Sequence, residues 1–326
     1  MAASAPLYLT DEFIKSNNLL QLAKLIPTIQ NAMAAVSKSN SDVIQPPRTL
    51  MHVPSRKGVF LSMPAFCEYD DALACKLVTA YPNNVNKGLP SVIGTVLLFD
   101  SSTGKVLAIM DGTEITTWRT AAASVVATKH LHNGTKILAV LGSGTQARSH
   151  IEALDYYFNF EQIRVWNHRS EGAQKLTEEL IGKGKTARAY ESGEECVKDA
   201  DVIVTATFAS SPILMSQWVK PGAHINAVGA GVSHHSELDP ELYRNVSIYT
   251  DTMAAAKVEL KGLAEMGVTI KGEVGEIING TTSVDRKEIT VFQSLGMQRA
   301  LQLQELKALH QRQNIKDSRT IQYVGN

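Results

Sequence analysis

The chain has 326 residues, of which 44% are apolar and 20% are charged. These values are typical of a globular protein, and the length predicts about two domains. The 32 basic residues balance 32 acidic residues, so the composition argues against a nucleic acid or an anionic membrane as partner.

The cysteines and the N-terminal sequence indicate the cellular compartment of the protein. Cys67, Cys75 and Cys196 form no C-x-x-C pair and are odd in number, so we expect neither a disulfide framework nor a structural zinc site. The N-terminal MAASAPLYLTDEF lacks the basic and apolar regions of a signal peptide, and no run of about 18 apolar residues occurs. We therefore predict a cytoplasmic protein without a bound metal.

The N-terminal part of the chain changes from a helical to a strand-like sequence pattern near residue 44. Residues 1–40 are predicted to be helical, because LLQLAKLIPTIQNAMAAV has helical spacing of apolar residues, with Pro27 as a start or a kink. Residues 44–110 contain GVFLSMP, ALACKLVTAYP and SVIGTVLLFD, which are typical of strands. SSTGK predicts a hairpin turn before VLAIMDG.

The remainder alternates between helices and strands. EITTWRTAAASVVATKHLHNG predicts one long helix, capped by Thr113 or Thr116 and closed by Asn133-Gly134. The next segments predict, in order, strand, helix, strand, helix, strand and strand: KILAVLG, TQARSHIEALDYYF, QIRVWN, AQKLTEELIGKG, DVIVTAT and HINAVGA. This alternation predicts an α/β fold with a doubly wound parallel sheet, followed by a last helix in TVFQSLGMQRALQLQELKALHQ.

A glycine motif, Gly142-x-Gly144-x-x-Ala147, follows the first strand of this alternation and opens the next helix. The first glycine permits a tight turn, the second lets the backbone approach a pyrophosphate, and the small third residue lets helix and strand pack closely. The helix N-terminus offers N–H groups to the phosphates. A plain turn is the alternative, but the context favours a Rossmann dinucleotide site.

The following strand ends at Trp166-Asn167-His168-Arg169-Ser170, about 20 residues later, where NAD sites usually carry an acid. Here Asn167, His168 and Arg169 could instead hold a 2′-phosphate. This favours NADPH over NADH as the cofactor without excluding NADH. The alternative is that Arg169 is an ordinary solvated arginine.

Three basic residues lie among apolar or small neighbours: Arg48, Lys76 and Arg119. Charges in such places are seldom buried without a partner. Arginines grip carboxylates with two parallel hydrogen bonds, and a partly desolvated lysine can exchange a proton near neutral pH. Together they predict an anion site, although each could instead face solvent or pair with an acid.

Two adjacent histidines, His234 and His235, follow HINAVGAGVS. Adjacent residues seldom bind one ion, and no further His or Cys cluster accompanies them, so we expect solvated or rim residues, one of which could touch substrate. Ser236 is predicted to cap the helix SELDPELYR.

Over nearly its whole length the chain resembles the ornithine cyclodeaminase/mu-crystallin family, and within it the mu-crystallin (ketimine reductase) branch. The motifs that carry the resemblance are QPPRT, MPAF, ALACKLVT, VLLFDSSTGKVLAIMDG, ITTWRTAA, VLGSGTQA, VWNHRS, WVKPGAHINAVGA, GEVGEII and TVFQSLGM.

The resemblance implies a homodimer with a substrate-binding and dimerisation domain of the α+β class at 1–118 plus 298–326, and a Rossmann domain at 119–297 that binds NADPH or NADH. It places substrate binding at Arg48, Lys76 and Arg119. Cofactor positions are implied at Ser91, Gly142, Ser143, Gly144, Thr145, Gln146, Ala147, Asn167, His168, Arg169, Thr207, Val228 and Ser294.

The chain departs from ornithine cyclodeaminases at two acids. Gly231, a predicted substrate-binding position, stands where those enzymes carry an aspartate. Leu61-Ser62 precedes Met63-Pro64 where they tend to carry a glutamate. Both differences argue against cyclisation of ornithine, and the mu-crystallin branch also lacks the aspartate.

The resemblance therefore favours an NAD(P)H-dependent imine reductase, an oxidoreductase that transfers hydride to the C=N carbon of a carboxylate-bearing cyclic ketimine. Lys76 and Arg119 are the predicted catalytic residues, and Glu259 is a weaker candidate that more often would be a surface acid. One alternative is an opine dehydrogenase that condenses pyruvate, a keto acid, with taurine or an amino acid. An alternative of another class is a thyroid-hormone-binding or structural, crystallin-like protein.

Overall fold

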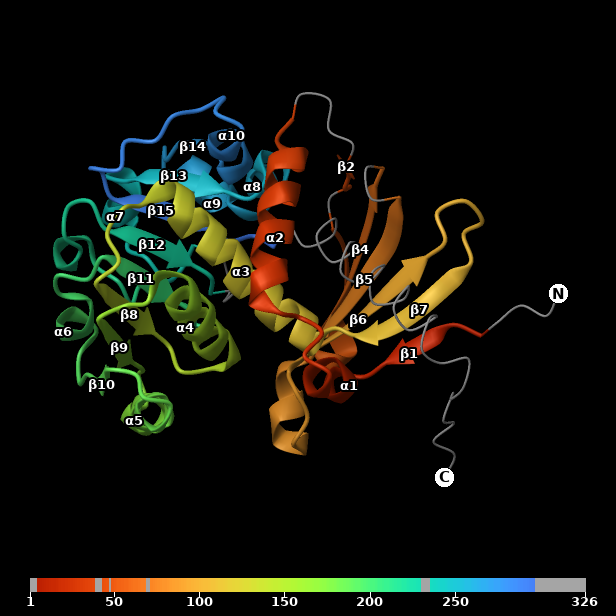
Figure 1. Ribbon diagram of the computed structural model, residues 1–326, viewed down its shortest axis with the longest axis horizontal. Coiled ribbons are helices and arrows are strands. Elements are labelled where there is room, and N and C mark those ends of the chain that lie inside the picture. Colours follow the sequence, from red (N-terminus) through yellow and green to blue (C-terminus); the bar gives the residue numbers. More distant parts are fainter. Residues whose placement is uncertain (1–4, 39–42, 47, 69–70, 230–234, 297–326) are drawn as a thin grey trace. The chain divides into compact units, whose positions relative to one another are not determined.

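The computed structural model describes residues 5–38, 43–46, 48–68, 71–229 and 235–296. The described chain divides into two compact units (Figure 1). The first unit holds residues 5–28 and 43–119, and the second holds 29–38 and 120–296, apart from the gaps just given.

The first unit is built on a seven-stranded sheet in the order β1-β7-β6-β5-β4-β2, with β3 also paired to β4. Strand β1 is parallel to β7, and the other pairs are antiparallel. Its elements are β1 Leu7–Leu9, α1 Asp11–Ser16, β2 Val43–Ile44, β3 Thr49–Val53, η1 Pro54–Arg56, β4 Gly58–Cys67, β5 Ala72–Ala80, η2 Pro82–Lys87, β6 Val92–Phe99 and β7 Val106–Asp111. Helices α2 Leu22–Val36 and α3 Thr113–Leu131 each contribute residues to both units.

The strands and the hairpin predicted between residues 58 and 111 are confirmed, since β6 and β7 pair on either side of the SSTGK turn. The prediction of helix throughout residues 1–40 is wrong at Leu7–Leu9. These residues form β1, which pairs with β7 about 100 residues away, and so short a strand shows no periodicity in the sequence. Pro27 lies inside helix α2 and does not begin it.

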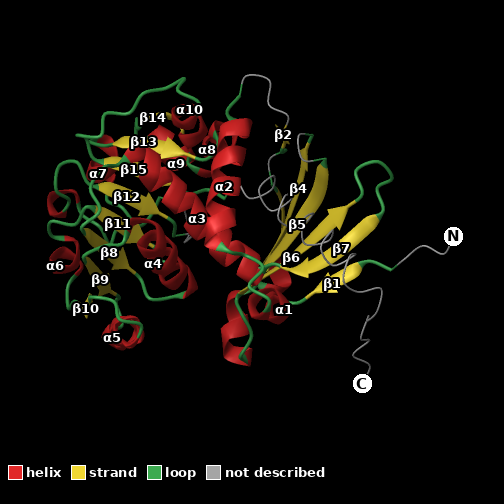
Figure 2. Cartoon of the chain, viewed as in Figure 1, coloured by secondary structure: helices red, strands yellow, loops and turns green. Residues whose placement is uncertain are grey.

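The second unit is a Rossmann-type α/β unit around an eight-stranded sheet, and all of its strand pairs are parallel (Figure 2). The strand order is β10-β9-β8-β11-β12-β15-β13-β14. Its strands are β8 Ile137–Leu141, β9 Gln162–Trp166, β10 Ala187–Ala189, β11 Val202–Thr205, β12 His224–Ala227, β13 Ser247–Thr250, β14 Ile270–Glu273 and β15 Thr290–Gln293. Its helices are α4 Thr145–Phe158, α5 Ser170–Gly182, α6 Gly193–Val197, η3 Ser216–Trp218, α7 Pro240–Arg244, α8 Met253–Glu259, α9 Lys261–Glu265 and α10 Val274–Ile278. The predicted α/β fold class is confirmed.

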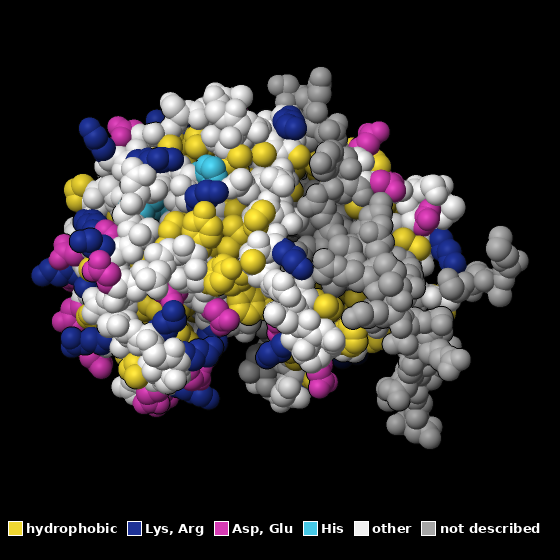
Figure 3. All heavy atoms as spheres, viewed as in Figure 1, with side chains coloured by type: hydrophobic (Ala, Val, Ile, Leu, Met, Phe, Trp, Pro, Cys, Tyr) yellow, Lys and Arg dark blue, Asp and Glu magenta, His cyan; other side chains and the backbone are white. Residues whose placement is uncertain are grey.

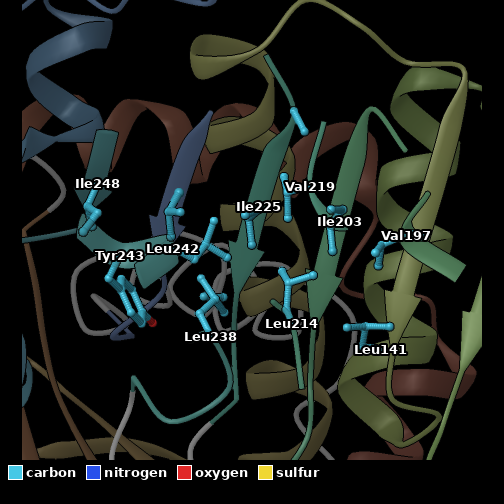
Figure 4. Close-up of a cluster of buried hydrophobic side chains, with 14 of the residues drawn as sticks. Leu141, Val197, Ile203, Leu214, Val219, Ile225, Leu238, Leu242, Tyr243 and Ile248 are labelled. Atoms are coloured by element: carbon cyan, nitrogen blue, oxygen red, sulfur yellow. The ribbon is translucent and has the colours of Figure 1, made fainter. Parts of the chain in front are cut away.

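The central strands of the parallel sheet, β8, β11, β12, β15 and β13, are buried on both faces, as their crossovers require. One face packs against α6 and α7 through a layer of aliphatic side chains that includes Ile203, Ile225 and Leu242 (Figure 4). On the opposite face, Asn226 of β12 donates a hydrogen bond to Thr128 of α3 over 3.0 Å. Helix α4 packs against β8 and β11.

Three local predictions in this half are wrong. Thr290–Gln293 is strand β15, inserted between β12 and β13, because its fully buried β-branched and aromatic residues fit a central strand. Residues 294–296 form neither helix nor strand, and the part of the predicted helix from residue 297 onward lies outside the described residues. Helix α3 begins at Thr113, so Thr116 is interior, and α7 is capped by Asp239 and not by Ser236.

Two surface properties complete the description. Among the described residues no helix combines the length and apolar character needed to cross a membrane. Figure 3 shows basic and acidic side chains interspersed over the visible face of the second unit.

A buried histidine marks the amino end of β12. His224 is fully buried and its Nδ1 lies 2.8 Å from Thr290 Oγ1. Its ring stacks on His132 with 6.1 Å between centroids. Burial, and secondarily the neighbouring His132, lowers the pKa of His224 from 6.5 to about 3. The imidazole is therefore held in its neutral form in the folded protein.

We expect His224 to make stability depend on pH. The unfolded chain protonates this group near its pKa of 6.5 and the folded chain only near 3, so the unfolded state takes up more protons as the pH falls between these values. From pH 7 to pH 5 this lowers the free energy of unfolding by about 2 kcal/mol. Denaturant titrations should show a weaker pH dependence for His224→Gln. His168→Gln, at an exposed site, serves as the control, and equal pH dependence in wild type and His224→Gln would contradict the assignment.

Candidate functional site

The candidate cofactor positions of the second unit follow five strands that are neighbours in the sheet, β9-β8-β11-β12-β15. Because these strands are parallel, their carboxyl ends meet at one edge, and the strand order reverses between β8 and β11, where ligands of such sheets bind. The structure thus brings together residues far apart in sequence: Gly142–Ala147 after β8, Asn167–Arg169 after β9, Thr207 after β11, Val228 after β12 and Ser294 after β15.

The glycine motif forms the turn from β8 into α4. Gly142 has φ +127°, and a Cβ there would lie 2.5 Å from the carbonyl oxygen of Ala206. Gly144 is the N-cap of α4 without a side-chain capping bond, and a Cβ there would meet nothing within 4 Å. Ala147 is fully buried. Gly142 thus lies in a tight turn, Gly144 faces open space and Ala147 is packed. This arrangement fits a pyrophosphate at the start of the 14-residue helix α4.

The end of β9 offers neutral and basic groups. Asn167 Nδ2 donates to the carbonyl of Arg169 over 3.0 Å, while His168 and Arg169 are exposed. Arg169 is the N-cap of α5 and makes no side-chain capping bond. A Cβ at Gly172 would lie 2.5 Å from Ser143 Oγ and 3.0 Å from Asn167 Nδ2, so both side chains flank the first turn of α5. The donors gathered here fit an anionic group such as a 2′-phosphate.

Lys76 lies on the buried face of the first unit's sheet and is 5% exposed. Its strand position is paired with Met63 on one side and Val96 on the other. Lys76 Nζ donates to Thr116 Oγ1 over 2.7 Å, and Thr116 Oγ1 donates in turn to the carbonyl of Gly112. A lysine in this apolar row is thus positioned by a hydroxyl of the first turn of α3. Sequence reasoning had treated Thr116 only as a possible cap.

The two candidate arginines lie in the same unit. Arg119 is 7% exposed and follows Thr116 by three positions, so it lies on the same face of α3. Arg48 is half-buried and leads into β3, whose first residue pairs with Ser62, next to the position paired with Lys76. Two strand spacings, about 10 Å of backbone, therefore separate Arg48 from Lys76. The structure thus places Lys76 against the first turn of α3, on the face that carries Arg119, and the backbone of Arg48 lies two strands away from that of Lys76.

The remaining predicted residues are distributed more widely. Ser91, in the first unit, directly precedes β6, and its carbonyl accepts from Tyr81 N–H over 2.7 Å. Gly231 and His234 lie outside the described residues. Glu259 is half-buried at the end of α8.

His235 was predicted to be a solvated or rim residue. It is half-buried, its ring occupies the space beside Gly262, and burial lowers its pKa. Its ring also meets Tyr243 edge-on, with 6.5 Å between centroids. Within the described ranges no group of three or more His, Cys, Asp and Glu side chains is arranged to hold a metal ion.

Glu237 is a buried residue at this edge that sequence reasoning missed. It is 2% exposed, and its carboxylate accepts from Thr207 N–H, Thr207 Oγ1–H and Gly229 N–H over 2.7, 2.6 and 2.8 Å. Burial raises its pKa, while hydrogen bonds from Thr207 and Gly229 act in the opposite direction. Because Thr207 Oγ1 also accepts from Ala209 N–H, its hydroxyl is already engaged within the protein.

Comparison with known proteins relates the chain to enzymes. Residues 9–310 match the model of the "Ornithine cyclodeaminase/mu-crystallin family". Ketimine reductase mu-crystallin of Mus musculus is 43% identical over 295 residues, covering 90% of this chain and 93% of the relative.

Two solved structures share the fold, each with a TM-score of 0.86. Thermococcus litoralis Delta(1)-pyrroline-2-carboxylate reductase in complex with NADH and L-proline is 33% identical, covering 95% of this chain and 97% of that one. An archaeal alanine dehydrogenase dimer with bound NAD is 29% identical, covering 95% and 96%.

We expect the two motif glycines to differ in their effect on stability. Gly142→Ala places a Cβ against the Ala206 carbonyl at a left-handed φ and should lower the free energy of unfolding by about 1–3 kcal/mol. Gly144→Ala meets open space and should unfold at a temperature close to that of the wild type. Thermal unfolding of both variants measures this difference, and equal destabilisation would contradict the described turn.

Proposed function

Because the chain belongs to the ornithine cyclodeaminase/mu-crystallin family, we propose that it is an NAD(P)H-dependent imine reductase. The observation that carries the proposal is the pairing of two features in one chain: a glycine turn at the switch point of a parallel sheet, and a buried lysine held by Thr116 beside Arg119. The first suits a dinucleotide, and the second suits a small anion.

The second unit would bind the cofactor, with its pyrophosphate at Gly142–Ala147 and the start of α4. A bound nicotinamide supplies a hydride, which is the redox chemistry of the reaction. The loops after β11, β12 and β15 would orient its nicotinamide half, and Thr207, Val228 and Ser294 lie within two residues of the strand ends.

The first unit would bind the substrate. Arg119 and Arg48 would hold the carboxylate. The ammonium of Lys76 would transfer a proton to the imine nitrogen, and the neutral amine of Lys76 would then accept a hydrogen bond from the iminium N–H. Protonation draws electrons from the carbon, so that carbon accepts the hydride more readily. The electron pair of the C=N bond then becomes the lone pair of the amine nitrogen, and no further proton is needed.

A preformed cyclic ketimine bearing a carboxylate is the substrate class we favour. The relatives described above include a ketimine reductase and a Delta(1)-pyrroline-2-carboxylate reductase, and both names denote reduction of a preformed C=N bond. The alternatives are condensation of pyruvate with an amine, as in an opine dehydrogenase, and a hormone-binding or structural role. The NAD(P)H oxidation assay distinguishes them from reduction of a cyclic ketimine.

We propose that NADPH is preferred over NADH. Arg169 and His168 are exposed at the end of β9, at the N-terminus of the 13-residue helix α5, where a 2′-phosphate would lie. None of the residues from Asn167 to Ser170 is an acid that would repel that phosphate. The relatives with bound NADH or NAD make both cofactors necessary in the test.

A homodimer in the cytosol completes the proposal. The face of the first unit's sheet opposite Lys76 carries Leu73, Cys75 and Leu77 of β5, all half-exposed, so it offers an apolar surface to a second copy. The related alanine dehydrogenase is a dimer. All three cysteines are free thiols, which suits a reducing compartment.

The reductase proposal predicts that Lys76→Met lowers kcat by about 100-fold or more, because the imine loses a proton donor, while the Kd for the cofactor stays unchanged. The measurement is the fall in absorbance of NADPH or NADH with Delta(1)-pyrroline-2-carboxylate, and separately with pyruvate plus taurine or alanine.

Lys105→Met, at an exposed lysine of the same unit, should match the wild type. If the protein binds the cofactor but neither an imine nor a mixture of pyruvate and amine leads to oxidation of NADPH or NADH, the reductase proposal is rejected in favour of a binding protein. Oxidation only with pyruvate plus amine would assign an opine dehydrogenase, and unchanged turnover in Lys76→Met would remove Lys76 from the mechanism.

The proposed preference for NADPH predicts that replacing Arg169 weakens binding of NADPH more than binding of NADH. Arg169→Ala should raise the Kd for NADPH about tenfold and change the Kd for NADH little, because only NADPH carries the 2′-phosphate. Fluorescence titration with each cofactor provides the two constants. Lys175→Ala, at an exposed cation of α5, is the control, and equal losses for both cofactors in Arg169→Ala would argue against the assignment.

A further inference from the structure

Glu237 joins loops that follow two different strands. One carboxylate oxygen, Oε1, accepts from the backbone N–H and the hydroxyl of Thr207, after β11, over 2.7 and 2.6 Å. The other, Oε2, accepts from Gly229 N–H, after β12, over 2.8 Å. A Cβ at position 229 would lie 2.1 Å from the Glu237 carboxyl carbon, so the backbone passes directly over this group.

The backbone around Glu237 is itself fixed. Its carbonyl accepts from Ile213 N–H over 2.8 Å and from Leu214 N–H over 3.1 Å. The preceding residue, Ser236, donates its hydroxyl to the carbonyl of Ala209 over 2.6 Å. Three hydrogen bonds thus hold the backbone on which the carboxylate is carried.

The connection extends to the glycine turn. The Thr207 methyl group, Cγ2, lies 3.3 Å from where a Cβ of Gly142 would be. Glu237 thus fixes Thr207, Thr207 lies against Gly142, and Gly229 follows the candidate cofactor residue Val228. One buried side chain thus holds two loops at the carboxyl edge directly, and one of them, through Thr207, lies next to the glycine turn.

We propose that Glu237 is a positioning residue for the dinucleotide. The Glu237 carboxylate holds the loops after β11 and β12 in the arrangement that binds the nicotinamide half of the dinucleotide. This inference rests on the proposed function. A carboxylate is required because both oxygens must accept. A glutamine offers one acceptor oxygen, and its NH₂ group would face the N–H of Gly229 or of Thr207.

A purely structural role for Glu237 would affect folding but not cofactor affinity. Asp201 provides the matched comparison, because its Oδ2 accepts from Lys136 and Ile137 N–H over 2.8 Å each and its Oδ1 from Lys220 over 2.6 Å. It therefore joins loops of β8 and β11 at the opposite, amino edge of the same sheet. Asp201→Asn should destabilise the fold without touching the cofactor edge.

The experiment measures unfolding temperature and the Kd for NADH and NADPH by fluorescence titration of the full chain, with KM for the cofactor and kcat as a second readout. Glu237→Gln should raise both Kd values about tenfold and raise KM more than it lowers kcat at saturating cofactor. Asp201→Asn should lower the unfolding temperature while leaving both Kd values within about twofold of wild type, as expected for a distant site.

A second pair keeps the inference testable if Glu237→Gln does not fold. Thr207→Val keeps the volume and loses the hydroxyl, and should weaken cofactor binding, whereas Thr207→Ser keeps the hydroxyl and should retain most of the affinity. Wild-type affinity in Glu237→Gln or Thr207→Val, or an equal loss of affinity in Asp201→Asn, would overturn the inference and leave the reductase proposal standing. Failure of the wild type to bind either dinucleotide would overturn both.

Discussion

Parallel pairing of the strands in the second unit is the constraint on which the rest of the site depends. Consecutive parallel strands must be joined by crossovers, so every strand leaves the sheet at the same edge. Segments near residues 142, 167, 207, 228 and 294 therefore meet there. The helices that begin near this edge present N-terminal N–H groups there, and the loops between strands and helices supply the side chains. Glu237 lies within this arrangement because it follows a loop from the same edge.

In the first unit, the buried apolar face of the sheet carries a basic residue, Lys76. Lys76 lies between Met63 and Val96 in the sheet, where removal from water disfavours a charge. The hydroxyl of Thr116 compensates part of that cost. An anionic ligand would compensate more, so binding of a carboxylate and stability of this unit are thermodynamically linked. The same burial that makes the lysine costly strengthens its interaction with a negative charge.

Sequence reasoning succeeded where a pattern is local. The glycine turn into a helix, the strand–helix alternation and the hairpin at SSTGK are visible in short windows. Lys76 and Arg119 also stand out in the sequence because charges interrupt apolar runs, and their role in binding stays a prediction. It failed where the deciding contact is distant. Strand β1 is defined by a partner about 100 residues away, and β15 by its two neighbours in the sheet. Thr116 and Glu237 could not be singled out, since only the fold shows which groups their polar atoms meet.

Strand β11 is fastened at both of its ends, by Asp201 at the amino edge and by Glu237 at the carboxyl edge. Each carboxylate also takes hydrogen bonds from a neighbouring strand's loop, β8 in one case and β12 in the other. Three central strands are thereby prevented from sliding past one another. We therefore expect these three strands to move as one body and to form a fixed frame for the more mobile parts of the chain.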